Sequence, residues 1–374
     1  MTTARRSLLK GAAAWGALSL STWSSAQTAA AVAAAAHNAR TFAPQPGTWR
    51  TFEVTTRVDV LKADGITRVW LPVPSVNTDW QQSGVSSFAS NGTARMRNDS
   101  LQGVQMLYAE FAASVDKPYV EITSRVQTQN RGLGAMAAPV RAEDAATLNY
   151  YTRPTQLLPT DGIVRETAQK AIAGATTDEG KVRAIYDWIV ANAWREPKVR
   201  GCGEGDIKTM LETGDLGGKC ADINALFVGL CRSVGIAARD VYGLRLAPSA
   251  FGYKELSGNP ANLKGAQHCR AEAYVKGRGW LAMDPADVAK VMRLETPEWI
   301  KSPQHPVVQP VYQTLFGGWE GNWVAWNTAH DVTLPQSQGE RLGFFMYPVA
   351  ENQEGRFDSY APDDFKYQIS AREI

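Results

Sequence analysis

Histidine and cysteine are scarce in this chain of 374 residues, with four of each. No two cysteines form a C-x-x-C pair and the histidines show no ligand spacing, which argues against a zinc site. We therefore predict no metal and no cofactor. The residues in question are Cys202, Cys220, Cys231, Cys269, His37, His268, His305 and His330.

The chain also lacks an excess of charge of either sign. Its 39 Lys and Arg residues nearly balance its 37 Asp and Glu residues, and no basic run is interleaved with aromatics. Nothing in this pattern favours nucleic-acid binding. No segment reaches the roughly 20 apolar residues that a membrane-spanning helix needs, so we expect no stable membrane insertion. The length allows two or three domains.

The first 26 residues carry a targeting pattern. Arg5-Arg6 precedes a weakly hydrophobic run over 11–21, and Ser24-Ser25-Ala26 offers a small-residue cleavage site. This pattern resembles a Tat-type signal peptide, which predicts a periplasmic or secreted protein. Residues 27–47 are expected to be a flexible segment. Export would permit disulfides, and a Cys202–Cys269 pair stays open at this point.

Residues 48–131 show the alternation of β-strands. Apolar and polar residues alternate over 52–60, 69–73 and 120–126, and turn-forming residues such as Ser90-Asn91-Gly92 separate these runs. This pattern predicts an N-terminal antiparallel β domain that resembles a sandwich. A linker containing Gly and Pro is expected over 132–159.

Helical periodicity begins in the next segment, 160–292. Capping residues near 160 and 177 predict helices over about 162–173 and 178–194, and Pro197 ends the second. The glycine-rich stretch 197–217 is expected to be a loop that leads to Cys220. Apolar residues then recur at helical spacing: Ile223, Leu226, Phe227, Leu230, Cys231 and Val234.

Cys220 is therefore placed at the first turn of a buried helix, directly after Gly217-Gly218 and Lys219. Free N–H groups and the helix dipole at that position lower a thiol pKa, which favours a thiolate nucleophile. The alternative is that Cys220 is one more small buried side chain. The Gly-Gly turn and the residues downstream favour the nucleophile.

A β-hairpin is predicted downstream of this helix. His268 and Arg270 share one face of the strand 268–275, whereas Cys269 faces the other way. With a three-residue loop at 276–278, Asp284 lies opposite Arg270 and one diagonal step from His268, roughly 7 to 8 Å away. Cys220, His268 and Asp284 would then supply a nucleophile, a proton carrier and a carboxylate that orients the imidazole. Singly, His268 and Asp284 would be interpreted as structural residues.

These motifs resemble the transglutaminase-like superfamily over about 160–291. The similar segments are 218–222 (GKCAD), 230–241 (LCRSVGIAARDV), 268–272 (HCRAE) and 279–285 (GWLAMDP). The resemblance implies an α+β fold with a papain-like core, in which the helix bearing Cys220 packs on an antiparallel sheet. It implies that Cys220, His268 and Asp284 form the catalytic triad.

The same resemblance implies an aromatic residue beside the oxyanion hole. Trp194 is the match for it, and Trp188 is the alternative. Asp222 and Arg239 also fit the family pattern, with a structural role favoured for both. Some members of the family bind calcium through acidic clusters, which we do not find in this sequence.

The resemblance further implies an exported cysteine acyl-transfer enzyme that acts on peptide or amide bonds through a thioester. Its substrate is expected to be a peptide or protein, with cell-envelope peptides as one class. Many bacterial proteins similar to this family look hydrolytic, which favours a peptidase or amidase. The alternatives are an amine-transferring, cross-linking transglutaminase and a non-catalytic binding or scaffold module.

The remaining segment, 293–374, is rich in aromatic residues. Trp299, Trp319, Trp323 and Trp326 fall in its first half. Their rings could form a wall of the substrate cleft or could be buried against the core or the β domain, and we favour burial. An alternating pattern over 365–369 predicts a final strand.

Overall fold

The computed structural model describes residues 40–61, 64–99, 103–132 and 142–374. The predicted signal peptide and most of the segment 27–47 lie outside these residues. The chain from Arg40 to Ile374 forms one unit by its internal contacts, and the description below concerns that unit.

The strands are β1 (Arg50–Asp59), β2 (Thr67–Pro72), β3 (Gln81–Ser90), β4 (Thr93–Asp99), β5 (Val104–Phe111), β6 (Tyr119–Thr128), β7 (Trp194–Arg195), β8 (Gly217–Gly218), β9 (Ala238–Arg245), β10 (Gln267–Val275), β11 (Gly279–Met283), β12 (Trp323–Asn327), β13 (His330–Val332), β14 (Leu342–Phe344), β15 (Val349–Asn352), β16 (Gly355–Arg356) and β17 (Tyr367–Glu373). The helices are α2 (Ala145–Tyr150), α3 (Gly162–Ala171), α4 (Asp178–Asn192), α5 (Ile207–Thr213), α6 (Cys220–Ser233), α7 (Pro285–Leu294), α8 (Gln309–Thr314) and α9 (Pro362–Phe365).

Two antiparallel sheets build the region that begins at β1. One has the strand order β17-β1-β6-β3, and the other has the order β16-β15-β2-β5-β4. Every second residue over most of β1 is buried, which confirms the alternation predicted for 52–60. Val54 and Val58 of the first sheet share one apolar core with Leu71 and Leu107 of the second. Burial of the inner faces of two sheets is the basis of a sandwich-like arrangement.

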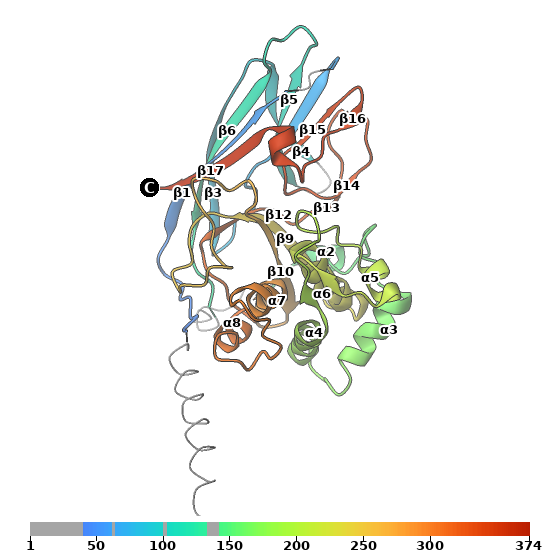
Figure 1. Ribbon diagram of the computed structural model, residues 1–374. Coiled ribbons are helices and arrows are strands. Elements are labelled where there is room, and N and C mark those ends of the chain that lie inside the picture. The colour runs from blue at the N-terminus through green and yellow to red at the C-terminus, as the bar shows by residue number, and fades with distance from the viewer. Residues whose placement is uncertain (1–39, 62–63, 100–102, 133–141) are drawn as a thin grey trace, which may run out of the picture. The chain divides into compact units, whose positions relative to one another are not determined.

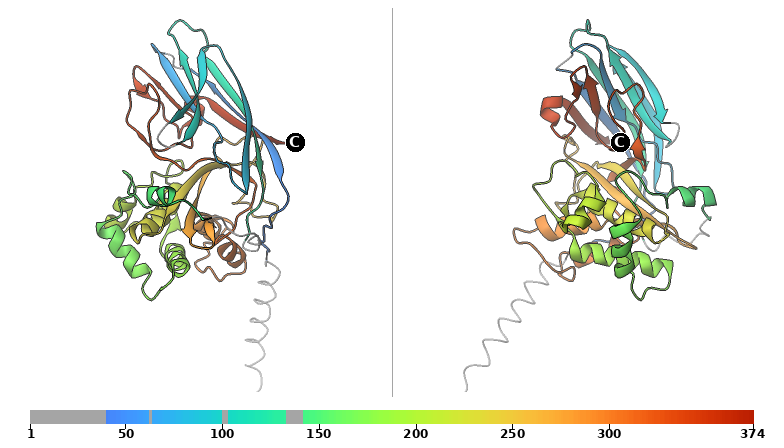
Figure 2. Two further views of the ribbon diagram at one scale, coloured as in Figure 1. Left: turned by 180° about the vertical axis from the view of Figure 1, so that it is seen from behind. Right: turned by 90° about the vertical axis from the view of Figure 1, so that its right-hand side faces the viewer.

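Strands from the end of the chain complete both of these sheets. β17 pairs antiparallel with β1, with Val54 opposite Ala371, and the red and blue strands lie side by side in Figures 1 and 2. β15 pairs with β2 in the other sheet, with Val349 opposite Trp70. The segment after residue 293 thus supplies strands to sheets that start about 280 to 320 residues earlier.

A third antiparallel sheet, with the order β11-β10-β9-β12, carries the helices. α6 packs against β9 and β10 (Figure 1). The helices α3, α4, α5 and α7 in turn contact α6. All residues of α6 are buried because the helix has a sheet on one side and helices on others. This is the mixed α and β arrangement with antiparallel sheets that the sequence predicts for a papain-like core.

The tryptophans of the C-terminal segment pack in two ways. Trp319, Trp323 and Trp326 are at most 2% exposed, and Trp299 is 37% exposed. The Arg270 guanidinium of β10 lies over the Trp323 ring at 4.7 Å, so this part of the segment packs against the third sheet. The burial of these three rings follows from their large apolar area.

Among the described residues, five helices lie where the sequence predicted none: α2, which falls in the expected linker 132–159, and α5, α7, α8 and α9. Two of them, α5 and α7, flank the candidate site. The stretch expected as a loop before Cys220 contains α5, whose N-cap Asp206 accepts a hydrogen bond from the Thr209 N–H and whose C-cap Gly214 is left-handed. α7 begins directly after Asp284, with Pro285 in its first turn. Both helices are short, and their caps stabilise them more than any long apolar periodicity does. None of the helices in the described ranges has the length and apolar character that crossing a membrane would need.

Gly243 of β9 sets how closely the third sheet can pack. A Cβ atom there would lie 2.1 Å from the Val324 carbonyl oxygen and 2.4 Å from the Trp323 ring. We expect Gly243→Ala to lower the free energy of unfolding by about 2 kcal/mol or more, because neither neighbour can shift cheaply. Gly265→Ala is the matched control, because no atom lies within 4 Å of its added Cβ. Urea unfolding of both variants tests this, and equal stabilities would contradict the close approach.

Candidate active site

The loop before α6 is fixed to the start of the helix by one carboxylate. The buried Asp222 side chain accepts hydrogen bonds from the backbone N–H groups of Lys219, Glu204 and Gly205 at 2.8 to 2.9 Å. Gly203 has a left-handed φ of +88°, and a Cβ there would lie 1.8 Å from the Asp222 carboxylate. The structural role expected for Asp222 is therefore to hold the glycine-rich loop around the helix start.

This anchoring places the Cys220 thiol at the first residue of α6. The N–H of the next residue, Ala221, donates to the Cys202 carbonyl at 2.9 Å. The Cys220 N–H has no acceptor within its own helix because it belongs to the first turn. A backbone N–H of a helix's first turn, next to a sulfur, is the kind of donor from which an oxyanion hole can be built.

His268 lies on β10 and contacts two carboxylates through one ring nitrogen. Its Nε2 is 2.8 Å from Asp284 Oδ2 and 3.4 Å from Asp287 Oδ2. The predicted hairpin register is confirmed, because Ala271 pairs with Met283 and Val275 pairs with Gly279. Engagement of Nε2 leaves Nδ1 as the nitrogen available to a thiol.

Asp284 is fully buried and also caps α7. Its Oδ1 accepts a hydrogen bond from the Asp287 N–H at 3.0 Å and lies 3.4 Å from the Asn224 side-chain nitrogen of α6. The same Asn224 nitrogen donates to the Cys269 carbonyl at 2.8 Å. One carboxylate and one amide thus connect the helix of Cys220, the strand of His268 and α7.

Asp287 is a second carboxylate at the site, and the sequence analysis missed it. Arg245 of β9 donates to both of its oxygens at 2.5 Å. All of these groups are at most 5% exposed. In the sequence, Asp287 is marked only by its position one helical turn after Asp284, which is a weak signal for a site residue. Its partner Arg245 is 42 residues away, so their contact could not be inferred before the fold was known.

The protonation of the site follows from these contacts. Burial lowers the pKa of His268, but the charges of Asp287 and Asp284 outweigh it and raise that pKa to about 9. Burial raises the pKa of the Cys220 thiol, but its interactions with Cys202, Cys269 and the charged His268 together hold that pKa well below its usual value. The arrangement favours a thiolate beside an imidazolium.

The two carboxylates differ from each other. Burial and the neighbouring Asp287 raise the pKa of Asp284. Burial also acts to raise the pKa of Asp287, yet Arg245 and His268 hold it well below the ordinary value. Asp287 is therefore the more firmly ionised of the two, because Arg245 forms a close ion pair with it.

The other cysteines are free thiols, and two of them surround Cys220. The neighbouring Cys220 and burial raise the pKa values of Cys202 and Cys269, so both stay neutral. The Cys202 thiol donates to the Gln267 carbonyl at 3.2 Å. From the alternation of the strand, Cys269 was expected on the face away from His268. α6 packs against β10, and the Cys269 sulfur lies 4.0 Å from the Asn224 side-chain nitrogen of that helix, so Cys269 also lies next to the site. Burial alone raises the pKa of Cys231, which is a packing residue.

Trp194 lies at the end of α4, in the short strand β7. This strand runs parallel to β8, with Trp194 opposite Gly217 and Arg195 opposite Gly218. The indole Nε1 lies 2.7 Å from where a Gly217 Cβ would be, so the ring packs against the backbone that leads to Cys220. Within the described ranges, Arg195 and not Trp194 lines the cavity at the site.

One group of ligand-type side chains in the described ranges is tight enough to hold a metal ion. Ligand atoms of His268, Asp284 and Asp287 lie within 4.8 Å of one another. The Asp287 oxygens are already engaged by Arg245, and the Asp284 oxygens by His268, Asn224 and a backbone N–H. The oxygen atoms that could bind a metal ion therefore already have partners within the protein. These hydrogen bonds and ion pairs account for the close grouping of the three side chains.

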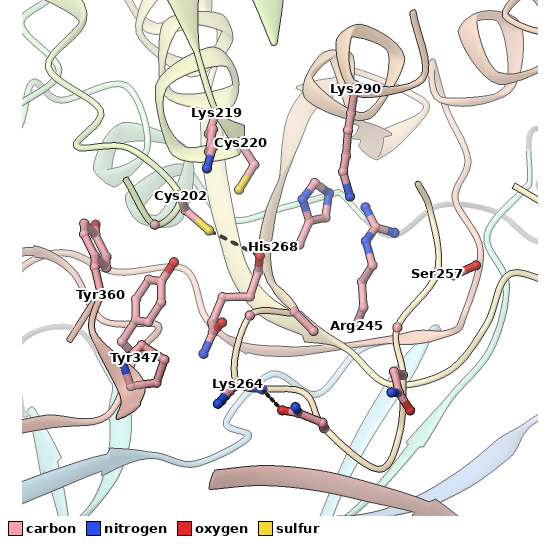
Figure 3. Close-up of a pocket in the computed structure, with 18 of the residues that line it drawn as sticks. Cys202, Lys219, Cys220, Arg245, Ser257, Lys264, His268, Lys290, Tyr347 and Tyr360 are labelled. Carbon is pink, nitrogen blue, oxygen red and sulfur yellow. Dashed lines mark hydrogen bonds between the residues drawn. The ribbon is translucent and has the colours of Figure 1, made fainter. Parts of the chain in front are cut away.

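Cys220 and His268 open on one cavity of about 630 Å³ (Figure 3). Tyr347, Tyr360 and Tyr367 from the C-terminal segment form part of its wall. The Tyr360 hydroxyl donates to the Gly203 carbonyl at 2.9 Å, which ties this wall to the loop before Cys220. The cavity is large enough for several residues of a peptide chain.

Comparison with known proteins identifies the family. The family model described as the transglutaminase-like superfamily matches residues 165–285, which include all three residues of the predicted triad. An uncharacterized protein of Haemophilus influenzae is 34% identical over 343 residues, which cover 86% of this chain and 91% of the relative. The chain belongs to the transglutaminase-like superfamily.

A solved structure shares the fold. A candidate cysteine protease of Cytophaga hutchinsonii is 16% identical, and the match covers 88% of this chain and 92% of that one with a TM-score of 0.52. At this identity the likeness concerns the fold, which agrees with the α+β, papain-like prediction.

Replacement of Asp287 tests the origin of the raised histidine pKa. Asp287→Asn removes one of the two carboxylates that raise the pKa of His268, so we expect this pKa to fall below 9. The imidazolium exists below its pKa, so the pH range that supports the ion pair shrinks on its alkaline side. NMR titration of labelled histidine measures the change. Asp178→Asn removes an exposed carboxylate of α4 and should leave the value at about 9. An unshifted titration in folded Asp287→Asn protein would contradict this account.

Proposed function

We propose that this protein is a cysteine acyl-transfer enzyme that cleaves peptide or amide bonds through a thioester on Cys220. The observation that carries the proposal is the contact of His268 with Asp284 at 2.8 Å, together with the opposite pKa shifts of Cys220 and His268. A thiolate and an imidazolium in contact provide a nucleophile and an acid in one site. Membership of the superfamily supports this class of chemistry.

The proposed reaction has two halves. The Cys220 sulfur attacks the carbonyl carbon, and His268 gives its proton to the departing nitrogen as the C–N bond breaks. In the second half His268 accepts a proton from water, the hydroxide oxygen bonds to the same carbon, and the C–S bond breaks to release a carboxylic acid. Asp284 holds the imidazole through Nε2 in both halves.

The negative oxygen formed in each half needs hydrogen-bond donors. The Cys220 N–H is one proposed donor. The Trp194 indole is proposed as the second, and within the described part of the chain its N–H has no hydrogen-bond partner. Its packing beside Gly217, three residues before Cys220, supports this assignment.

The charge of the cavity favours water as the acyl acceptor. The lining includes Arg195, Lys219, Arg245, Lys264 and Lys290, and none of the lining residues is Asp or Glu. A lysine or polyamine acceptor arrives as an ammonium ion, which these cations repel. Water carries no such penalty. We therefore propose hydrolysis, as a peptidase or amidase, ahead of transfer to an amine.

The proposed site of action is outside the cytoplasm. The twin-arginine pattern at residues 4–10 supports export by the Tat pathway, although it lies outside the described residues. A peptide or protein of the cell envelope is the proposed class of substrate.

Alkylation by iodoacetamide, read by peptide mass spectrometry, tests the nucleophile. We expect Cys220 to react on the order of tenfold faster than Cys202 at neutral pH, because only Cys220 has a lowered pKa. Cys202 is an internal control, because it lines the same cavity. His268→Ala should remove the preference. Equal alkylation rates at Cys220 and Cys202 would show that Cys220 is not a thiolate at neutral pH. The proposed enzymatic function would then be rejected.

The acyl acceptor can be tested with p-nitrophenyl acetate, a general acyl donor. We expect one burst of nitrophenolate per protein, an acetyl group on Cys220 by mass spectrometry, and no burst from Cys220→Ala. Deacylation should release acetate at a rate that added cadaverine does not raise. N-acetylcadaverine as the main product would instead support the transglutaminase alternative. If no acetyl group is found on the protein, the alternative of a non-catalytic binding module would be supported.

A further inference from the structure

Among the described residues, two of the five cations that line the cavity form no ion pair with a carboxylate. Arg245 pairs with Asp287 at 2.5 Å and Lys264 pairs with Asp363 at 2.5 Å. Lys290 donates to the Glu255 carbonyl and lies 3.4 Å from the Glu255 carboxylate. Within the ranges that the structure describes, Arg195 and Lys219 have no ion-pair partner.

The side chains of Arg195 and Lys219 are both partly buried, and both line the cavity together with Cys220. Lys219 directly precedes Cys220, and the pairing of β7 with β8 holds Arg195 opposite Gly218. The Glu196 N–H donates to the Gly218 carbonyl at 2.9 Å, which fixes this register. The Arg195 Nε is a buried nitrogen without a hydrogen-bond partner among the described residues. Burial and the charge of Arg195 lower the pKa of Lys219, as expected where two cations crowd one wall.

The charges of the reaction centre do not neutralise this pair. Cys220 thiolate, Asp284 and Asp287 supply three negative charges, and His268, Arg245 and Arg270 supply three positive ones. Arg270 belongs to this group because its Nε lies 3.5 Å from Asp284 Oδ2. The Asp222 carboxylate also acts on Lys219, but it already accepts hydrogen bonds from three backbone N–H groups. Arg195 and Lys219 therefore still outnumber the one carboxylate beside them on a partly buried wall, and an additional anion would stabilise this arrangement.

We propose that Arg195 and Lys219 bind a carboxylate of the substrate next to the bond that Cys220 attacks. This inference rests on the proposed function and narrows it to acidic peptides. A peptide brings its anionic groups as carboxylates, and a guanidinium binds a carboxylate through paired hydrogen bonds. Lys219 adds a point charge on the same side. The bound carboxylate fixes the acyl group against the sulfur.

Two small alkylating reagents test this charge selectivity without knowledge of the substrate. Iodoacetate and iodoacetamide both transfer a carbon to the Cys220 thiolate and release iodide, but only iodoacetate carries a carboxylate. We expect iodoacetate to be favoured by about tenfold, after division by the same rate ratio for N-acetylcysteine. High salt should reduce this preference because it screens charges.

Variants locate the preference. Arg195→Gln and Lys219→Gln should each lower the normalised ratio severalfold, whatever happens to the absolute rates, and Arg195→Lys should restore most of it. Lys208→Gln is the matched control, because Lys208 is exposed on α5 and pairs with Glu212. It should leave the ratio unchanged. The two glutamine variants remove different side chains, so one folded variant is enough for the test.

The outcomes separate this inference from the proposed function. Fast alkylation of Cys220 by both reagents at a normalised ratio of one or less overturns the carboxylate site and leaves the nucleophile in place. A preference for iodoacetate that survives both glutamine substitutions also overturns it. A Cys220 that reacts with neither reagent overturns the proposed function, and this inference with it.

Discussion

The neutralisation of buried charge is the constraint on which the candidate site depends. His268, Asp284, Asp287, Arg245 and Arg270 are each at most 5% exposed, as is Cys220. A lone ion at such depth costs several kcal/mol, so each member needs the others in position. The members come from α6, β9, β10 and α7. Few other arrangements of these four elements would bring all of the charged groups into contact with their partners.

The same constraint explains why the site is built on rigid elements. Asn224 of α6 reaches both the Cys269 carbonyl and Asp284, and the His268 carbonyl accepts a hydrogen bond from the Trp323 indole at 2.8 Å. The histidine is thus held at its backbone by the C-terminal segment and at its ring by the start of α7. Strands β15 and β17 of the same segment complete the sheets that begin with β2 and β1. The chain end and the reaction centre share one folded unit.

Local pattern was sufficient for the elements that carry the predicted triad. The helical stripe after Cys220, the alternation through His268 and a three-residue turn before Asp284 each depend on neighbours in sequence. Arg245, Asp287 and Arg195 could not be found in this way, because their significance comes from contacts across the fold. Cys269 shows the same limit. Alternation gives the face of a strand correctly but does not say which face a helix covers, and here α6 packs against the strand that carries Cys269.

The positive charge of the cavity wall bears on both halves of the proposed reaction. Attack on an amide or on a thioester creates an oxyanion, and hydrolysis ends with a carboxylate where a neutral acyl group stood. A wall that carries Arg195 and Lys219 stabilises each of these negative species relative to the neutral ones. Transfer to an amine would end with a neutral amide and would gain nothing from the wall after the second oxyanion collapses. The field that attracts an acidic peptide is therefore also the field that favours its hydrolysis.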